Sequence, residues 1–170
     1  MQARGFVVVQ PHGLPPPLFE RTLDELPTIQ LPDGFTVQGV RNLDDGRLRA
    51  AVTHGAFRPN DDWEGYSAEY AKFIGSAVYD GERDLFVRSP DSRGASACGI
   101  WFDPVNAVEL FEPVATHLDF QGKGLGKAVM AAGMRRAIVG FDPNNAAALA
   151  LYTSMWFRAS CYFVMYRKEL

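Results

Sequence analysis

Residues 114–129 read VATHLDFQGKGLGKAV, and this stretch decides what the rest of the chain can be. It joins an apolar, strand-like run to a segment in which apolar residues recur at i, i+3, i+4 and i+7 from Leu125, the spacing of one helix face. Three glycines and two lysines lie between the strand and the helix. Such loops commonly bind phosphate, so the stretch predicts an anion site at the start of a helix.

Two familiar phosphate motifs do not fit the loop. A P-loop needs glycine at the position of Gln121 and a hydroxyl at that of Ala128, and both are missing. The dinucleotide fingerprint fails from either starting glycine, because its last position falls on Lys127 or Val129. What remains is the pattern Q-x-x-G-x-G between a strand and a helix.

That pattern still has a physical reading. The first turn of a helix carries N–H groups without acceptors and the positive end of the helix dipole. Gly124 and Gly126 have no Cβ to keep an anion from those groups, and Lys123 and Lys127 add positive charge at the rim. The loop therefore predicts a phosphate or pyrophosphate held without metal; the alternative is a plain tight turn with solvated lysines.

Composition limits the class of protein. The chain has 170 residues, 47% of them hydrophobic, which suits one domain with a substantial core. The formal net charge of -3 argues against a general nucleic-acid binder. No apolar run of about 18 residues is present, so we expect a soluble, cytoplasmic protein that does not enter a membrane. Cys98 and Cys161 lie in apolar, strand-like settings and predict buried free thiols, with no metal site.

The first 33 residues differ in composition from the rest of the chain. Residues 5–10 predict a short strand, and prolines recur from Pro11 to Pro32, which predicts an arm without regular helix or central strand. We therefore expect a strand and arm over residues 1–33 and a compact domain over 34–170.

Within the domain the order is strand, two helices, three strands, helix, strand, helix, strand. The first helix is expected over 47–56 with Asp44 or Asp45 as N-cap, and the second over 67–79 with Ser67 as N-cap. Pro113 predicts a bulge inside the strand over 107–117. The other expected strands cover 35–40, 84–89, 95–102, 137–141 and 161–168; the later helices run from the glycine loop to Gly133 and from Asn144 or Asn145 to about Ser154.

Two motifs together carry a resemblance to a known family. VATHLDFQGKGLGKAV resembles motif A of the GNAT acetyltransferase superfamily, a strand followed by Q/R-x-x-G-x-G/A and a helix. Residues 145–157, NAAALALYTSMWF, look like its motif B, N-x-x-A-x-x-L-Y-x-x-x-G-F. The motifs occur in the family's order, and the resemblance covers residues 35 to 170. Three departures are Leu118 in place of a frequent proline, a short helix after the loop, and Trp156 in place of the glycine of motif B, where a positive φ would be strained.

The resemblance implies an α/β (α+β) fold: a single GNAT-like domain with a mixed twisted sheet and helices on both faces. The strands over 108–117 and 137–141 would be parallel neighbours that splay apart. It also implies that the ligand is acetyl-CoA, with the pyrophosphate on the loop and the pantetheine arm between these strands. The cofactor-binding residues would then be Val114, Ala115, Thr116, Gln121, Gly122, Lys123, Gly124, Leu125, Gly126, Lys127, Asn145 and Tyr152.

The implied reaction is transfer of an acetyl group to a primary amine by direct attack. An amine must lose its proton to attack, so a base is needed, and Glu112 and Glu109 are the candidates, with Glu112 favoured because it adjoins the bulge. Tyr152 matches the family's tyrosine beside the thioester sulfur and would protonate the leaving thiolate. Each of these residues also has a purely structural alternative.

The function stays open between two classes. The first is an N-acetyltransferase acting on a small-molecule or peptide amine, and the second is a non-catalytic acyl-CoA-binding module that acts as a sensor or interaction partner. The N-terminal strand is expected to add to a sheet edge of its own domain or of a second copy, in which case the protein is a homodimer; the alternative is a frayed tail.

Overall fold

The computed structural model describes residues 6–9, 17–21, 29–103, 105, 108–133, 137–140, 142, 144–162 and 165–168. The chain forms two compact units, Thr22–Ala137 and Met1–Arg21 with Ile138–Leu170, and each is described by itself. The predicted mixed α/β architecture is confirmed. The expected boundary between residues 33 and 34 stays a prediction.

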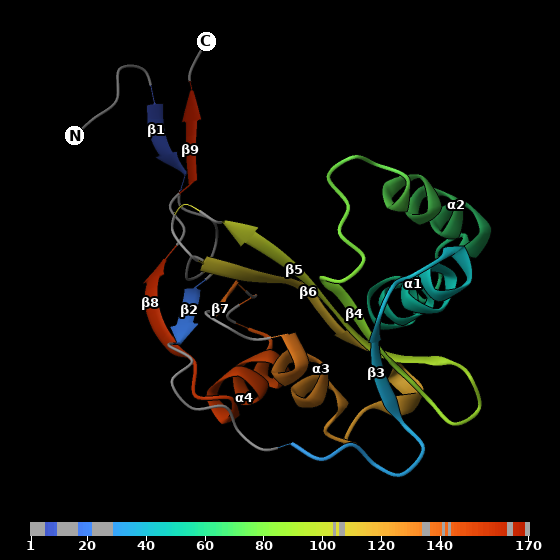
Figure 1. The fold of residues 1–170 in the computed structure, drawn as a ribbon. Coiled ribbons are helices and arrows are strands. Elements are labelled where there is room, and N and C mark those ends of the chain that lie inside the picture. Colours follow the sequence, from blue (N-terminus) through green and yellow to red (C-terminus); the bar gives the residue numbers. More distant parts are fainter. Residues whose placement is uncertain are drawn as a thin grey trace. The chain divides into compact units, whose positions relative to one another are not determined.

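The larger unit is built on an antiparallel sheet (Figure 1). Its strands β3 (Thr36–Gly39), β4 (Asp84–Arg88), β5 (Gly94–Asp103) and β6 (Val108–Thr116) are neighbours in this order. Phe86 pairs with Ala97, and Ala97 with Ala115. Since side chains alternate between the faces of a strand, this row of residues lies on one face of the sheet.

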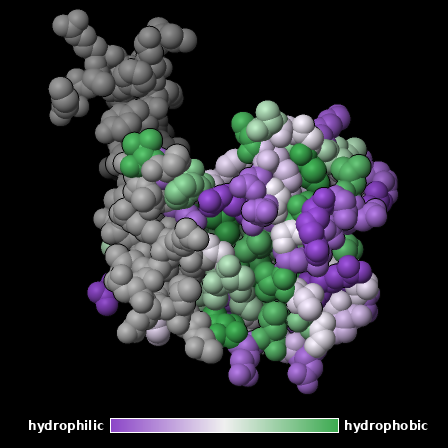
Figure 2. Space-filling view, in the orientation of Figure 1, coloured by the Kyte–Doolittle hydropathy of each residue, from purple (hydrophilic) through white to green (hydrophobic). Residues whose placement is uncertain are grey.

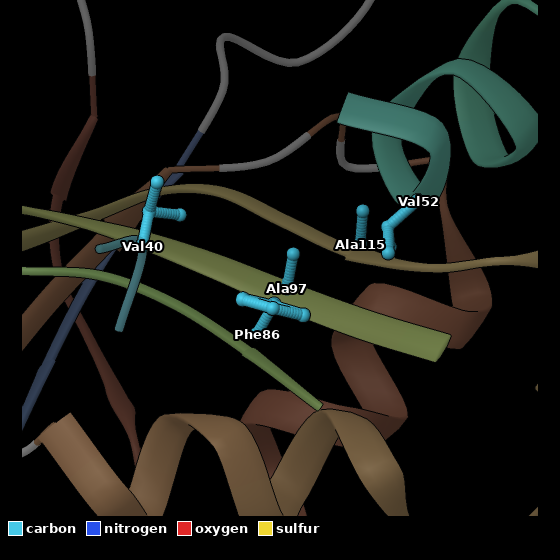
Figure 3. Packing of buried hydrophobic residues seen from close by; sticks show 5 residues of the cluster. All are labelled: Val40, Val52, Phe86, Ala97 and Ala115. Atoms are coloured by element: carbon cyan, nitrogen blue, oxygen red, sulfur yellow. The ribbon is translucent and has the colours of Figure 1, made fainter. Parts of the chain in front are cut away.

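Helices cover both faces of this sheet. On one face lie α1 (Leu43–Phe57) and α2 (Trp63–Ile74), and on the other α3 (Leu125–Gly133), as Figures 1 and 3 show. Val52 of α1 points toward Ala115 (Figure 3) and is fully buried in a cluster with Val40, Phe86 and Ala97. Gly133 of α3 packs so closely on Ile100 that a Cβ there would lie 2.2 Å from its Cδ1 atom.

Both predicted caps of the first two helices were wrong. Asn42 caps α1, and its side chain accepts from the Asp45 N–H at 2.8 Å, while the Asp45 carboxylate turns to Gln38 and the Arg41 N–H. Asp62 caps α2, and it accepts from the N–H groups of the two residues that follow Trp63. Ser67 lies inside this helix.

The predicted bulge in β6 is confirmed. Cys98 pairs with Val114 and Ile100 with Phe111, so two residues, Glu112 and Pro113, stand opposite Gly99 alone. A Cβ on Gly99 would lie 2.7 Å from the Glu112 carbonyl oxygen, so only glycine fits opposite the bulge. The Trp101 indole N–H donates to the same oxygen at 3.0 Å and stabilises it.

The smaller unit contains α4 (Ala146–Ser154) and strands from both ends of the chain. β1 (Phe6–Val9) pairs antiparallel with β9 (Met165–Lys168), and β2 (Pro17–Arg21) lies between β7 (Ala137–Gly140) and β8 (Arg158–Tyr162). The N-terminal strand therefore adds to a strand of its own chain. Two expectations were wrong: the proline-rich segment does contain a central strand, which begins at its last clustered proline, and the single final strand is two strands.

The end of α4 resolves the question raised by Trp156. Its φ is +65°, the left-handed value expected of glycine at this position. The Phe157 N–H donates to Tyr152 O and the Trp156 N–H to Thr153 O, both at 3.0 Å, which is the bond pattern of a Schellman motif. The tryptophan thus adopts the left-handed geometry that glycine usually supplies at the end of a helix.

Candidate active site

The glycine loop has the geometry of an anion site. After β6 a short 3-10 turn, Leu118–Phe120, leads to Gly122 and Gly124, whose φ values are +77° and +75°. Apart from the adjoining residues of the chain, no atom lies within 4 Å of the place where a Cβ on either glycine would be. The first bond of the helix runs from the Ala128 N–H to Gly124 O at 3.2 Å, so the N–H groups before it have no acceptor within the helix.

Positive charge surrounds the loop. The Lys123 ammonium lies 5.2 Å from the centroid of the Phe120 ring and 5.8 Å from that of Phe35. The Arg93 guanidinium lies 4.9 Å from the Phe120 centroid and forms an ion pair with Asp119. The hydrogen bond from Arg93 lowers the pKa of the Asp119 carboxyl. Arg93 had no signal in the sequence, because it lies just before β5, far from the loop along the chain.

Between the bulge and the loop, the backbone N–H and C=O groups of β6 face its two edges in alternation. The His117 N–H donates to Ala95 O at 3.0 Å, directly opposite, so alternation makes Ala115 and Ala97 the next hydrogen-bonded pair. The N–H and C=O groups of Val114 and Thr116 therefore point to the other edge of β6. Of these, Thr116 O accepts from the Gln121 side chain at 3.4 Å.

The structure separates the two candidate glutamates. Glu109 is 4% exposed, and its carboxylate forms an ion pair with Arg83 at 3.2 Å. Glu112, at the bulge, is exposed and lines a cavity. The Glu109 carboxylate is thus engaged by Arg83, whereas Glu112 is exposed beside the cavity.

This cavity has a volume of about 510 Å³ and lies wholly within the larger unit. Its walls come from α1, α2, the segment that leads into β4, β5 and the bulge of β6. Figure 2 shows hydrophobic residues on the surface of this unit. Three exposed hydrophobic residues line the cavity: Val78, Trp101 and Phe102. The volume is in the usual range for sites that bind small molecules.

One wall of the cavity is a buried polar network that the sequence did not predict. The Arg49 guanidinium donates to Asp84 Oδ1 at 2.6 Å, and the hydroxyls of Tyr70 and Tyr79 donate to Asp84 Oδ2. Burial and the nearby Asp84 charge raise the pKa of both phenols. Burial is the strongest single influence on Arg49 and would lower its pKa, but the charge and hydrogen bond of Asp84, together with Tyr70 and Cys98, outweigh burial, so the pKa is raised.

The remaining predicted residues have clear structural settings. Asn145 is the N-cap of α4 and accepts from the Ala148 N–H at 3.0 Å. Tyr152 is 5% exposed on that helix, with its ring 5.9 Å from that of Phe157, in the smaller unit. Cys98 is a buried free thiol, and burial raises its pKa; the side chain of Cys161 lies outside the described residues.

The described residues contain neither a helix that could span a membrane nor a cluster that could bind a metal ion. None of the helices in the described part of the chain is long and apolar enough to cross a membrane. Among the same residues, no three His, Cys, Asp or Glu side chains are grouped so that they could hold a metal ion.

Solved structures of acetyltransferases resemble this chain. A GCN5-related N-acetyltransferase from Sphaerobacter thermophilus is 20% identical with a TM-score of 0.70, over 97% of this chain and 53% of its own. One from Kribbella flavida is 15% identical with a TM-score of 0.62, over 96% and 60%. A tandem GNAT protein from the clavulanic acid biosynthesis pathway is 15% identical with a TM-score of 0.61, over 90% and 53%. No family model and no curated protein matches the sequence.

These likenesses and the motifs agree on the architecture. The chain has the fold of the GCN5-related N-acetyltransferases. It spans between half and two thirds of the length of the first two solved structures.

Proposed function

We propose that the protein is an N-acetyltransferase that transfers the acetyl group of acetyl-CoA to a primary amine. The observation that carries the proposal is the open loop at the start of α3, joined by the last residues of β6 to a bulge with an exposed glutamate and a cavity. The GNAT fold supports the same function.

The residues at the loop fit the pyrophosphate of acetyl-CoA. Beyond the adjoining residues, no atom of the protein fills the space at Gly122 and Gly124, and the N–H groups before Ala128 supply donors. Lys123 and Lys127 would offset the negative charge, and Arg93, which like Lys123 lies against the Phe120 ring, would join them.

The pantetheine arm would follow β6 from the loop to the bulge. Val114 and Thr116 direct their backbone groups away from β5, so they are the proposed hydrogen-bond partners, whereas those of Ala115 are directed at Ala97. Four residues of strand span about 13 Å, a distance suited to an extended arm. The splayed pair of parallel strands implied by the family remains part of this proposal.

Glu112 is the proposed general base. When bound, acetyl-CoA supplies an activated acetyl group as a thioester, which a neutral amine attacks with loss of the thiolate. The Glu112 carboxylate, directly or through a water, accepts the proton that the amine nitrogen must lose. Glu109 has a different role, because with Arg83 it supports the wall from which Phe102 extends.

Tyr152 is the proposed proton donor to the leaving thiolate, on the strength of motif B alone. Asn145 is its companion in that motif, although its observed role is to cap α4. Replacing Tyr152 with Phe is expected to lower turnover while CoA affinity, measured by calorimetry, stays the same.

The test uses the full chain, acetyl-CoA and a panel of primary amines, with release of free thiol as the signal. We expect turnover, and we expect Glu112→Gln to lower kcat by about 10²–10⁴ near neutral pH without changing CoA affinity. The matched control is Glu82→Gln, an exposed glutamate outside the cavity. CoA binding without thiol release from any amine would instead identify an acyl-CoA-binding module.

A further inference from the structure

The cavity beside the bulge has a lining chemistry that selects among amines. Its lining residues, which run from Arg49 to Pro113, are far apart in the sequence and lie outside the two sequence motifs. Six aromatic side chains line it, and most of its wall is apolar; they are Tyr66, Tyr70, Phe73, Tyr79, Trp101 and Phe102.

The rings form a continuous wall around Phe73. The centroid of this ring lies 5.0 Å from that of Tyr79, 5.9 Å from that of Tyr70 and 6.1 Å from that of Trp101. Edge-to-face and tilted contacts at these distances are favourable for aromatic groups, so a further flat ring would find the same geometry.

The charges of the lining are nearly all compensated. Asp84 is bound by Arg49 at 2.6 Å and by two phenol hydroxyls, one of them from Tyr79 at 3.0 Å. Asp80 forms an ion pair with Arg83 at 3.2 Å. These carboxylates are therefore already engaged, and a cation that displaced their partners would leave an arginine without its counter-charge.

Glu112 is different. Among the ion pairs and side-chain hydrogen bonds of the described residues, none involves its carboxylate; its backbone oxygen accepts from the Trp101 indole N–H. The cavity thus offers one free negative charge, and it lies at the bulge, where β6 turns toward the loop.

We propose that the acceptor is a monoamine carried on one aromatic or bulky apolar body, with the amine at Glu112 and the body against Phe73. This inference rests on the proposed acetyltransferase function. The site has no second free carboxylate among its described lining residues, so polyamines, aminoglycosides and lysine-rich peptides would bring charges that find no partner there.

The experiment compares phenethylamine with ethylamine and putrescine as acceptors for the full chain. We expect kcat/KM for phenethylamine to exceed that for each of the others by about tenfold or more, because only its ring uses the aromatic wall. Binding of phenethylamine is measured separately by calorimetry without acetyl-CoA, so that it does not depend on turnover.

Two variants locate the effect. Phe73→Ala should lower kcat/KM for phenethylamine by about tenfold or more and change that for ethylamine little. Val78→Asp, at a position 75% exposed and therefore tolerant of charge, should lower the preference for phenethylamine over putrescine because it adds a second carboxylate to the rim. Phe57→Ala, an exposed phenylalanine outside the cavity, is the matched control and should change neither ratio.

The outcomes separate this inference from the function beneath it. Turnover of putrescine at or above the rate for phenethylamine overturns the inference and leaves the acetyltransferase function standing. Phenethylamine binding that depends on Phe73, with no turnover of any amine, supports the assignment of the cavity and overturns catalysis. If phenethylamine is neither bound nor acetylated, the inference is overturned.

Discussion

Gly124 is the residue whose substitution should disturb the anion site most directly. Its φ of +75° and the open space around it leave room for a bound phosphate. We expect Gly124→Asp to abolish CoA binding, because the side chain fills that room and its carboxylate repels the anion. Calorimetry with CoA measures this, and Ala132→Asp, an exposed position on the same helix, is the control for charge alone. Unchanged affinity in a folded Gly124→Asp protein would contradict the site.

Trp156 adopts a backbone conformation that is unfavourable for residues other than glycine. Its left-handed φ of +65° closes the Schellman motif at the end of α4. Trp156→Gly and Trp156→Ala both remove the indole, but only glycine adopts this φ without a Cβ penalty. We expect the glycine variant to be more stable than the alanine variant by about 1 kcal/mol, measured by denaturant unfolding. Equal stability would show that the positive φ carries no cost here.

At the scale of elements, the network that ties α1 to β4 depends on compensation of a buried charge. Asp84→Ala would leave Arg49, which is 2% exposed, without its partner. Breaking a buried pair from one side costs about 3–5 kcal/mol, which we expect as a loss in the free energy of unfolding. Asp91→Ala, which removes exposed contacts with Arg93 and Ser89, should lower the free energy of unfolding far less than Asp84→Ala does.

The same network predicts how stability changes in alkali. In the unfolded chain Tyr70 and Tyr79 lose their protons near pH 10, whereas burial and Asp84 keep them protonated in the folded protein at higher pH. Their contribution to stability is therefore present below about pH 10 and lost as the pH rises further. The melting temperature should fall between about pH 9 and pH 11, and by less in a Tyr70→Phe, Tyr79→Phe double variant. An equal fall in both proteins would mean that other groups control the alkaline limit.

The sequence predicted those elements whose signals are local. The apolar spacing after Leu125 located α3, Pro113 located the bulge, and Asn145 was correctly one of two candidate caps. The cap of α1 was missed because Asn42 lies before the two aspartates, and Asp45 is drawn to Gln38. Local composition cannot weigh such competing partners.

The cavity could not be predicted in the same way. Arg49 and Asp84 are 35 residues apart in the chain, and only the packing of α1 on the sheet brings them together. The prediction that the proline-rich segment contains no central strand was wrong for a related reason. Its prolines do discourage strand pairing, but Pro17 opens a run, Leu18 to Arg21, that is free of proline and pairs with β8.

For the whole molecule, the N-terminal segment offers the most direct test of organisation. β1 and β2 pair with β9 and β8, so deleting residues 1–31 would leave the N–H and C=O groups of those partners without their bonds. We expect the deletion to lower the melting temperature and to promote association through the bared edges, and a deletion of residues 1–12, which removes β1 alone, to have a smaller effect. Light scattering compares the full chain with its monomer mass of 18.8 kDa and tests the predicted homodimer. A dimer that survives both deletions is not built on the N-terminal strand, and a deletion of residues 1–31 that leaves mass and melting temperature unchanged would show that neither strand contributes to the fold.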